Sequence, residues 1–389
     1  RGNDQVLEAF GELEIPLLRN LPFAQDLTLN VSARATDYRS YGTDYTYKIG
    51  GIYTPVDWLS LRGTYGTSYR APALFEQYLS PTSGFLSSNL DPCNNYGALD
   101  ATSPRAVNCA AEGLSPNFQA TSGVTVFQMG GAAAGLEAET STNLTVGLVF
   151  QPELGTAFGD LSLAVDYYDI KVSNGEARAG ASSILSLCYD DPQFRAGGSF
   201  CRLVTRAAGS NALTVNDSYI NLSVDIVRGI DYTLRYARDI GTARLRINGV
   251  LNQYLEQSGK LFADDPLDDL NGTLNTPKFS GQIDGTVEWK SWQFRYGLEW
   301  VDGMDSTEYL GLDPATSTYI FKVDDYFTHS ASVRWRGDDF GITMGVRNLT
   351  NRTPPQISAG AYSRVGNSPL YSGYDYVGRT FFINVSADF

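Results

Sequence analysis

The chain has 389 residues, a net charge of −14 and a pI near 4.6, so no nucleic-acid partner is expected, because nucleic-acid-binding surfaces are basic. It is rich in Tyr (24), Phe (19) and Gly (39). No run approaches the roughly 18 consecutive apolar residues of a membrane-spanning helix, which excludes transmembrane helices. This composition is instead typical of long strands joined by tight turns.

Apolar and polar side chains alternate with a period of two residues from near the start of the chain. The pattern is clearest over residues 27–35, where Leu, Val and Ala alternate with Thr, Asn, Ser and Arg. Taken in order, the pattern predicts about 13 strands. These lie at 7–15, 27–35, 45–53, 59–65, 144–150, 161–167, 222–236, 243–251, 279–289, 292–300, 327–335, 340–346 and 377–389.

The predicted connections alternate between short turns and long segments. Short turns are expected near 17–23, 55–57, 152–158, 238–241, 290–291 and 337–339. Longer connections are expected at 38–44, 70–138, 174–215, 257–275, 305–322 and 348–376. Outer-membrane barrels have short periplasmic turns and long extracellular loops, whereas a soluble sandwich does not sort its loops in this way. The sorting therefore predicts an all-β fold, a transmembrane antiparallel up-and-down β-barrel.

The final stretch, Val377–Phe389, shows what each face of such a strand carries. Val377, Phe381, Ile383 and other mostly apolar residues share one face, and small polar residues share the other. A strand that is apolar outside, polar inside and ends on an aromatic residue is typical of the closing strand of a barrel. Phe389 is therefore our candidate for a residue used in barrel assembly.

The predicted inward face carries charges of both signs. Two interpretations stay open: a water-filled lumen that tolerates charge, or a surface that pairs with a polar plug inside the barrel. The inward charged residues are Arg34, Lys48, Arg62, Asp225, Asp231, Arg235, Arg244, Arg246, Asp284, Glu288, Arg295, Glu299, Arg334 and Arg336.

The four cysteines form two close pairs, Cys93 with Cys109 and Cys188 with Cys201, each within one long Gly/Ser/Pro-rich segment. Local pairs of this kind predict disulfides that staple loops in an oxidising compartment. A structural zinc site is the weaker alternative, because the chain has no C-x-x-C spacing and its one histidine, His329, is distant. The acidic segment Asp264–Asp269 lacks the spacing of a regular calcium loop and is interpreted as solvated.

Aromatic residues in the long connections are the candidate ligand contacts, because such rings stack on sugars and on aromatic groups. Packing within the loops or at the membrane interface is the competing interpretation. The candidates are Tyr309, Tyr319, Tyr362, Tyr371 and Tyr374. His329 lies on the predicted outward face, so no Ser-His-Asp set can be assembled toward the lumen. We expect no catalytic, cofactor or metal residues.

Three stretches together resemble the C-terminal barrel of TonB-dependent outer-membrane receptors. They are Gly63–Tyr78, then Glu137–Pro152 followed by Leu161–Ile170, and finally Val346–Pro355 with Gly378-Arg-Thr and the terminal Phe389. The cysteine segment, with Asp91-Pro-Cys93 and Asn108–Gly113, resembles a branch found in proteobacteria that have very many such receptors. The order and spacing of these motifs span essentially the whole chain.

The resemblance implies a barrel of about 22 strands with an N-terminal plug, neither of which is visible in full here. Residues 1–389 are then expected to be the C-terminal part of the barrel. The resemblance also implies uptake energised by TonB, which pulls on the plug, in the outer membrane of a Gram-negative bacterium among lipid and lipopolysaccharide. The nutrient would be a ferric siderophore, cobalamin, a peptide or, slightly favoured, a carbohydrate. A passive porin and a structural or surface-binding barrel are the alternatives.

Overall fold

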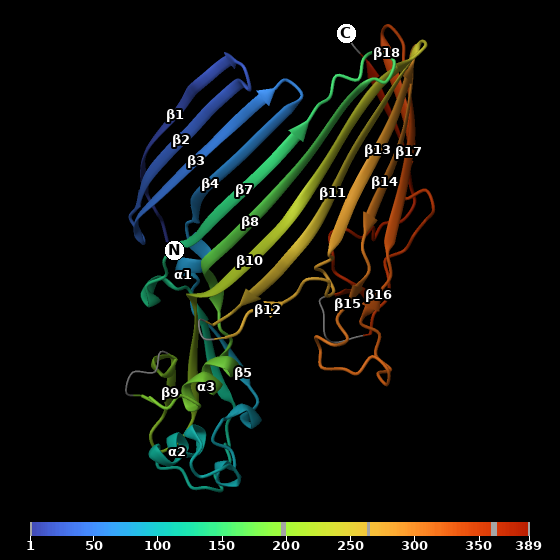
Figure 1. Ribbon diagram of the computed structural model, residues 1–389. Helices are drawn as coiled ribbons and strands as arrows, with labels where there is room; N and C mark the ends of the chain where they lie inside the picture. Colours follow the sequence, from blue (N-terminus) through green and yellow to red (C-terminus); the bar gives the residue numbers. More distant parts are fainter. Residues whose placement is uncertain (1, 196–199, 263–264, 359–363, 388–389) are drawn as a thin grey trace.

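The computed structural model describes residues 2–195, 200–262, 265–358 and 364–387. It consists of a curved wall of long tilted strands with short turns at one end and large folded connections at the other (Figure 1). All of the predicted strands are present. The wall strands are β1 (Val6–Leu21), β2 (Ala24–Tyr38), β3 (Gly42–Val56), β4 (Leu59–Arg70), β7 (Glu139–Phe150), β8 (Asp160–Arg178), β10 (Leu213–Ile240), β11 (Ala243–Lys260), β13 (Phe279–Trp289), β14 (Trp292–Val301), β17 (Tyr326–Arg336), β18 (Phe340–Arg347) and β21 (Thr380–Ala387).

Each wall strand pairs antiparallel with the next one along the chain, as in an up-and-down barrel. At the two sides of the wall, β1 pairs with β2 and β21 pairs with β18. Within the described part of the chain neither edge strand has a second partner, so the sheet is open at both sides (Figure 1).

Several strands run further than the alternation predicted. β1 continues to Leu21 and β3 to Val56, through segments that we expected to be turns. Their prolines lie at irregularities of the ladder, because the pairing shifts between Pro16 and Leu18 and between Tyr53 and Val56. A bulge tolerates the missing N–H of proline, so these prolines bend the strands instead of ending them.

The strand β10 is 28 residues long and begins at Leu213, nine residues before the predicted start at 222. Near its start, Asn216, Asp217 and Ser218 are residue types common in turns, yet they pair in parallel with β6 (Val124–Met129). The Asp217 carboxylate accepts the Gly180 N–H at 3.0 Å, so its polar side chain is satisfied inside the folded connection. A strand need only be about 9–11 residues long to cross a bilayer, so β10 extends far past that length.

Two rows of outward aromatic residues cross the wall. Trp289, Trp292 and Trp335 are cross-strand neighbours near the short turns, and Phe279, Trp300 and Phe327 stack near the long connections. Trp292 and Trp300 lie eight residues apart on β14, which is roughly 26 Å along the strand. Residues 292–300 make up a nine-residue stretch, which is about the length at which a tilted strand crosses a bilayer, so the two rows are placed as aromatic girdles are in outer-membrane barrels. None of the helices in the described ranges is long and apolar enough to cross a membrane.

The long connections 70–138 and 174–215, rich in Gly, Ser and Pro, contain helices and strands of their own. They fold together into what we call the first loop module, residues 82–129, 179–195 and 200–218, with a core of its own. The apolar residues of this core are spread along both segments. The periodicity of a short stretch of sequence therefore does not predict the core. These two connections contain α1 (Leu74–Tyr78), β5 (Thr82–Leu86), η1 (Ser88–Leu90), η2 (Tyr96–Ala98), α2 (Pro104–Ala111), β6, η3 (Ala132–Ala134), α3 (Ala181–Tyr189), η4 (Cys201–Leu203) and β9 (Val204–Arg206).

A second loop module lies over the last strands and is made of residues 270–276, 301–326, 348–358 and 364–376. Its buried core combines Leu274, Met304, Phe321, Tyr326 and Tyr374 with neighbouring apolar residues. Short two-residue strands fix its turns. They are β15 (Met304–Asp305) with β16 (Lys322–Val323), and β19 (Arg364–Val365) with β20 (Ser368–Pro369); β12 (Asp268–Asp269) pairs with β11 nearby.

Candidate functional site

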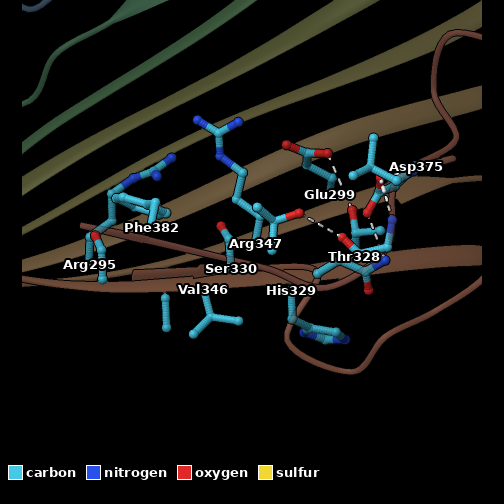
Figure 2. Close-up of a pocket in the computed structure, with 15 residues that line it drawn as sticks. Arg295, Glu299, Thr328, His329, Ser330, Val346, Arg347, Asp375 and Phe382 are labelled. Atoms are coloured by element: carbon cyan, nitrogen blue, oxygen red, sulfur yellow. Dashed lines mark hydrogen bonds between the residues drawn. The ribbon is translucent and has the colours of Figure 1, made fainter. Parts of the chain in front are cut away.

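The inward face of β14, β17, β18 and β21 forms a pocket of about 430 Å³, lined by charged, polar and apolar residues, which we call the luminal pocket. Figure 2 shows Arg295, Glu299 and Arg347 on one side of these strands, and His329 and Val346 on the other. The alternation of a strand places neighbouring side chains on opposite faces, so the charged groups share the inward face. His329 lies outward, as predicted, where its Nδ1 is 2.6 Å from the hydroxyl of Tyr296.

The charges of the luminal pocket differ in how they are paired. Arg295 forms an ion pair with Asp284 of β13, and Glu299 accepts a hydrogen bond of 3.3 Å from the Thr328 hydroxyl. The Arg347 guanidinium stacks on the Phe382 ring, 5.6 Å from its centroid, and has no ion pair within the described residues. Arg347 is therefore the cation of this pocket that is available to an acidic group.

Arg347 was not among the residues that we predicted to face inward, although the alternation could have shown it. The outward residues of β18 are Phe340, Ile342, Met344 and Val346, so Arg347 falls next on the inward face. Asp375, by contrast, reaches the pocket from the second loop module, where its carboxylate accepts a hydrogen bond of 2.7 Å from Asn348. No local pattern of the sequence predicts that approach.

Several of the predicted inward charges form ion pairs with a charge on the neighbouring strand or, for Arg62 of β4 with Asp166 of β8, on the next strand but one. Each pair balances a positive charge with a negative one. The pairs by themselves therefore favour neither a water-filled lumen that tolerates charge nor a surface that pairs with a polar plug. The pairs are Arg34 with Glu8, Arg62 with Asp166, Arg246 with Glu288 and Arg295 with Asp284.

A carboxylate cluster joins the wall to its first long connection at the ends of β4, β7 and β8. Arg70 binds Glu139 through two hydrogen bonds of 2.7 and 2.9 Å, Glu76 of α1 at 3.0 and 3.2 Å, and Glu176 at 3.2 Å. The Glu176 side chain is fully buried, and its Oε1 has no hydrogen-bond partner in the described residues. One arginine thus faces three carboxyl groups.

The pKa values of these three carboxyl groups diverge for identifiable reasons. Burial, together with the adjacent Glu76 carboxyl, raises the pKa of Glu176 to about 8. The hydrogen bonds from Arg70 lower the pKa of Glu139. For Glu76, burial acts to raise the pKa, but the bonds from Arg70 and the Ala73 N–H outweigh it and lower the pKa. Glu176 lies nine residues past Tyr167 on β8 and so beyond the span between the aromatic rows.

Buried charges also join the two halves of the first loop module. The Arg206 side chain is 4% exposed and donates two hydrogen bonds of 2.8 Å to Asp91 and one of 2.5 Å to Glu112. The Tyr189 hydroxyl donates to Glu112 at 2.7 Å. Although burial acts to lower it, the pKa of Arg206 is raised because the Asp91 carboxylate binds the charged form. Arg206 thereby links residues more than a hundred positions apart.

The structure pairs the cysteines as the local spacing predicted. Disulfides join Cys93 to Cys109 and Cys188 to Cys201, and both lie in the core of the first loop module. The N–H of Cys93 donates to Asp91, so the first bridge and the Arg206 network share a residue.

The candidate ligand-binding tyrosines do not form one cluster. Tyr309 is 48% and Tyr319 is 59% exposed on the second loop module, and both stay predictions. Tyr371 and Tyr374 stack edge-to-face on each other, and Tyr374 is 5% exposed against Tyr326, so its ring supports the loop instead of presenting a surface. Tyr362 and the barrel-assembly candidate Phe389 lie outside the described residues. Within the residues that the structure describes, no group of three or more His, Cys, Asp or Glu side chains is arranged to hold a metal.

Comparison with known proteins gives matches of two kinds. The family model described as "TonB dependent receptor-like, beta-barrel" matches residues 2–349. Among solved structures, the ferric enterobactin receptor PfeA of Pseudomonas aeruginosa is similar at 16% identity and a TM-score of 0.62, covering 99% of this chain and 45% of that one. The siderophore receptor PirA of Acinetobacter baumannii matches at 14% identity and a TM-score of 0.61, covering 100% of this chain and 47% of that one.

A more distant similarity is to the FrpB iron transporter of Neisseria meningitidis, at 10% identity and a TM-score of 0.52, covering 99% of this chain and 45% of that one. At these identities the similarity shows the fold alone. The chain spans about half the length of the solved structures that it matches. No curated protein sequence is significantly similar to it.

Proposed function

Because the chain belongs to the TonB-dependent receptor β-barrel family, we propose that it forms the wall and extracellular loops of an outer-membrane receptor that imports a scarce nutrient with energy from TonB. The members of this family are transporters and receptors and not enzymes. The observation that carries the proposal is the contrast between the two faces of the wall. The outward face presents an apolar band between two aromatic rows, and the inward face presents paired charges and the luminal pocket.

The long connections, at about 70–138, 174–215, 257–275, 305–322 and 348–376, would be extracellular in this arrangement. The two loop modules would then frame the entrance to the lumen, and the short turns would face the periplasm. The exposed Tyr309 and Tyr319 would offer aromatic surface to a ligand at that entrance.

The open edges of the wall bear directly on how the receptor works. Unpaired backbone groups of β1 and β21 would be costly in lipid, so the proposed function requires other strands to complete the barrel. A plug inside the completed barrel would face the inward charges, among which Arg347 is available to an acidic side chain. TonB would act on that plug and not on the residues described here.

The substrate class is the least constrained part of the proposal. The similar solved structures include siderophore receptors, which supports a ferric siderophore as the substrate. The resemblance of the cysteine segment instead favours a carbohydrate. Growth of a deletion strain under iron limitation, and separately on candidate carbohydrates as carbon source, distinguishes the two. We expect one condition to show a growth defect that the intact receptor gene restores.

Dependence on TonB is tested by accumulation of that same nutrient in cells with and without TonB. Loss of accumulation without TonB is the expected result. Accumulation that persists without TonB, with an ohmic channel in planar bilayers, would overturn the proposal and favour the passive porin.

A further inference from the structure

The strand β5 forms one edge of the small sheet in the first loop module. It pairs antiparallel with β6, which pairs in turn with β10, and no other strand of the described residues pairs with β5. Its first four residues are exposed, and Phe85 is 76% exposed. An edge strand directs alternate N–H and C=O groups away from its one partner. The outer edge of β5 therefore presents a row of backbone donors and acceptors to solvent.

The sequence of β5 leaves this edge open to pairing. Natural proteins protect an exposed edge with charged side chains, with a proline inside the strand or with a bulge. The segment Thr82–Leu86 contains neither a charge nor a proline, and all five residues pair with β6 in unbroken register. Such an edge fits another extended backbone, because a second strand offers donors and acceptors at the same spacing.

A pocket of about 350 Å³, which we call the β5 pocket, lies beside this strand, between β5 and the start of α3. Figure 1 shows the two elements next to each other in the first loop module. Gly84 lines the pocket and lies opposite Val126 of β6, which is 6% exposed. A Cβ on Gly84 would meet nothing within 4 Å. The missing side chain thus leaves room for one that enters from outside, next to the open edge.

The polar groups of the β5 pocket favour a neutral side chain over an ion. The Asp217 carboxylate, 3% exposed, accepts the Gly180 N–H at 3.0 Å and lies 4.0 Å from the Arg178 guanidinium, so its charge is already matched. Its Oδ2, beyond hydrogen-bond distance of that guanidinium, remains an acceptor. The first N–H groups of α3 have no partner within the helix, and no side chain caps them. An acceptor and donors in one pocket match the amide of Asn or Gln, which needs both.

We propose that β5 binds an extended peptide, which adds to the sheet as a further strand and places one amide side chain, of Asn or Gln, in the β5 pocket. The main-chain hydrogen bonds of the added strand supply affinity, and the pocket supplies selectivity. The open edge and the pocket are separate observations, since one comes from strand pairing and the other from Gly84 and the position of α3. The inference rests on the proposed function, because it names a peptide as the ligand that the extracellular loops capture.

The experiment measures binding of synthetic peptides to the intact receptor in detergent, through the hydrogen exchange of residues 82–86. The probes are acetyl-Thr-Val-Xaa-Val-Thr-amide, in which Xaa is Asn, Leu or Lys. We expect the Asn peptide to slow exchange of β5 by about fivefold or more, at lower concentration than the Leu and Lys peptides. Two further Asn peptides are N-methylated, one at its valines and one at the other three residues. An added strand uses the N–H groups of alternate residues only, so one of these two should bind and the other should not.

Two glycines provide a matched pair of variants. Gly84→Leu fills the β5 pocket and should remove the preference for Asn, whereas Gly285→Leu, on β13 of the wall, should leave it unchanged. A Cβ on either glycine meets nothing within 4 Å, so both variants should fold. Exchange of β5 that no peptide slows, equal binding of the two N-methylated peptides, or an unchanged Asn preference in Gly84→Leu would overturn the inference. Failure of the proposed function is read separately, as accumulation of the nutrient without TonB.

Discussion

The two loop modules lie at the same end of the wall but are held together by different interactions. The first contains both disulfides and a buried arginine bound to two carboxylates. Within the described residues the second has no disulfide, and its one ion pair, between Lys322 and Asp305 at 3.8 Å, is exposed. It depends instead on stacked tyrosines and on hydrogen bonds such as that from Leu274 N–H to the Ser306 hydroxyl. We expect the first module to behave as a rigid unit and the second to adapt more easily to a ligand.

The largest loss of stability in the first loop module is expected from substitution of Arg206. Arg206→Met leaves the Asp91 carboxylate, 2% exposed, without its cation, and removing one partner of a buried pair costs about 3–5 kcal/mol. Hydrogen exchange of residues 82–129 in the intact receptor should rise accordingly. Arg202→Met, at an exposed arginine of the same module, is the control and should change little. Unchanged exchange in Arg206→Met would show that the buried charges do not hold the module together.

A disulfide should matter slightly less. The double variant Cys93→Ser and Cys109→Ser opens a bridge between residues 16 positions apart, for which the chain-entropy estimate is about 3 kcal/mol. We expect faster exchange confined to the first loop module. Equal loosening of the second module would mean that the two are not independent, contrary to the comparison.

In the second module, a pair of tyrosines separates hydrogen bonding from packing. The Tyr326 hydroxyl donates to Arg352 O at 3.2 Å and accepts from Asp375 N–H, so Tyr326→Phe should cost about 1 kcal/mol. The Tyr374 hydroxyl is buried without a partner in the described residues, so Tyr374→Phe should cost nothing or stabilise. Exchange of residues 364–376 measures both, and a larger cost for Tyr374→Phe would contradict this assignment.

The smallest expected effect is a dependence of stability on pH. It arises at the carboxylate cluster where the wall joins the first loop module. A carboxyl group whose folded pKa is raised stabilises the fold below its unfolded pKa and loses that contribution as pH rises through the folded value. For Glu176 the window runs from its ordinary 4.5 to about 8. Burial of Glu176 drives this shift, but solvent reaches the cluster past the half-exposed Arg70 and screens its charges, so we expect about 1 kcal/mol or less. Exchange of α1 should rise across this window in the unsubstituted receptor and stay level in Glu176→Gln. A rise that persists in Glu176→Gln would assign the titration to another group.

The sequence predicts the wall far better than the modules, for a physical reason. A strand between lipid and a water-filled lumen must alternate apolar and polar side chains. Segments such as Leu27–Ala35 and Trp292–Trp300 can therefore be predicted as strands from their own residues alone. The cysteines likewise pair over short distances. Arg206 and Asp91, by contrast, meet only because two loops fold together, and Asp375 reaches the luminal pocket from a distant segment. A period of two residues along the sequence does not predict contacts between distant segments. For the same reason it places Tyr374 in a loop but does not predict that the Tyr374 ring is buried.

The orientation of the wall supports every functional statement above, and labelling of single cysteines in intact cells tests it most directly. All described cysteines are in disulfides, so an added cysteine is the one reactive thiol among them. Tyr319→Cys lies on the second loop module, and Asp239→Cys lies at the turn between β10 and β11, where the side chain is 71% exposed. With a membrane-impermeant maleimide, we predict labelling of Tyr319→Cys in whole cells and of Asp239→Cys only after the outer membrane is permeabilised. The reverse pattern, or equal labelling of both in whole cells, would contradict the account.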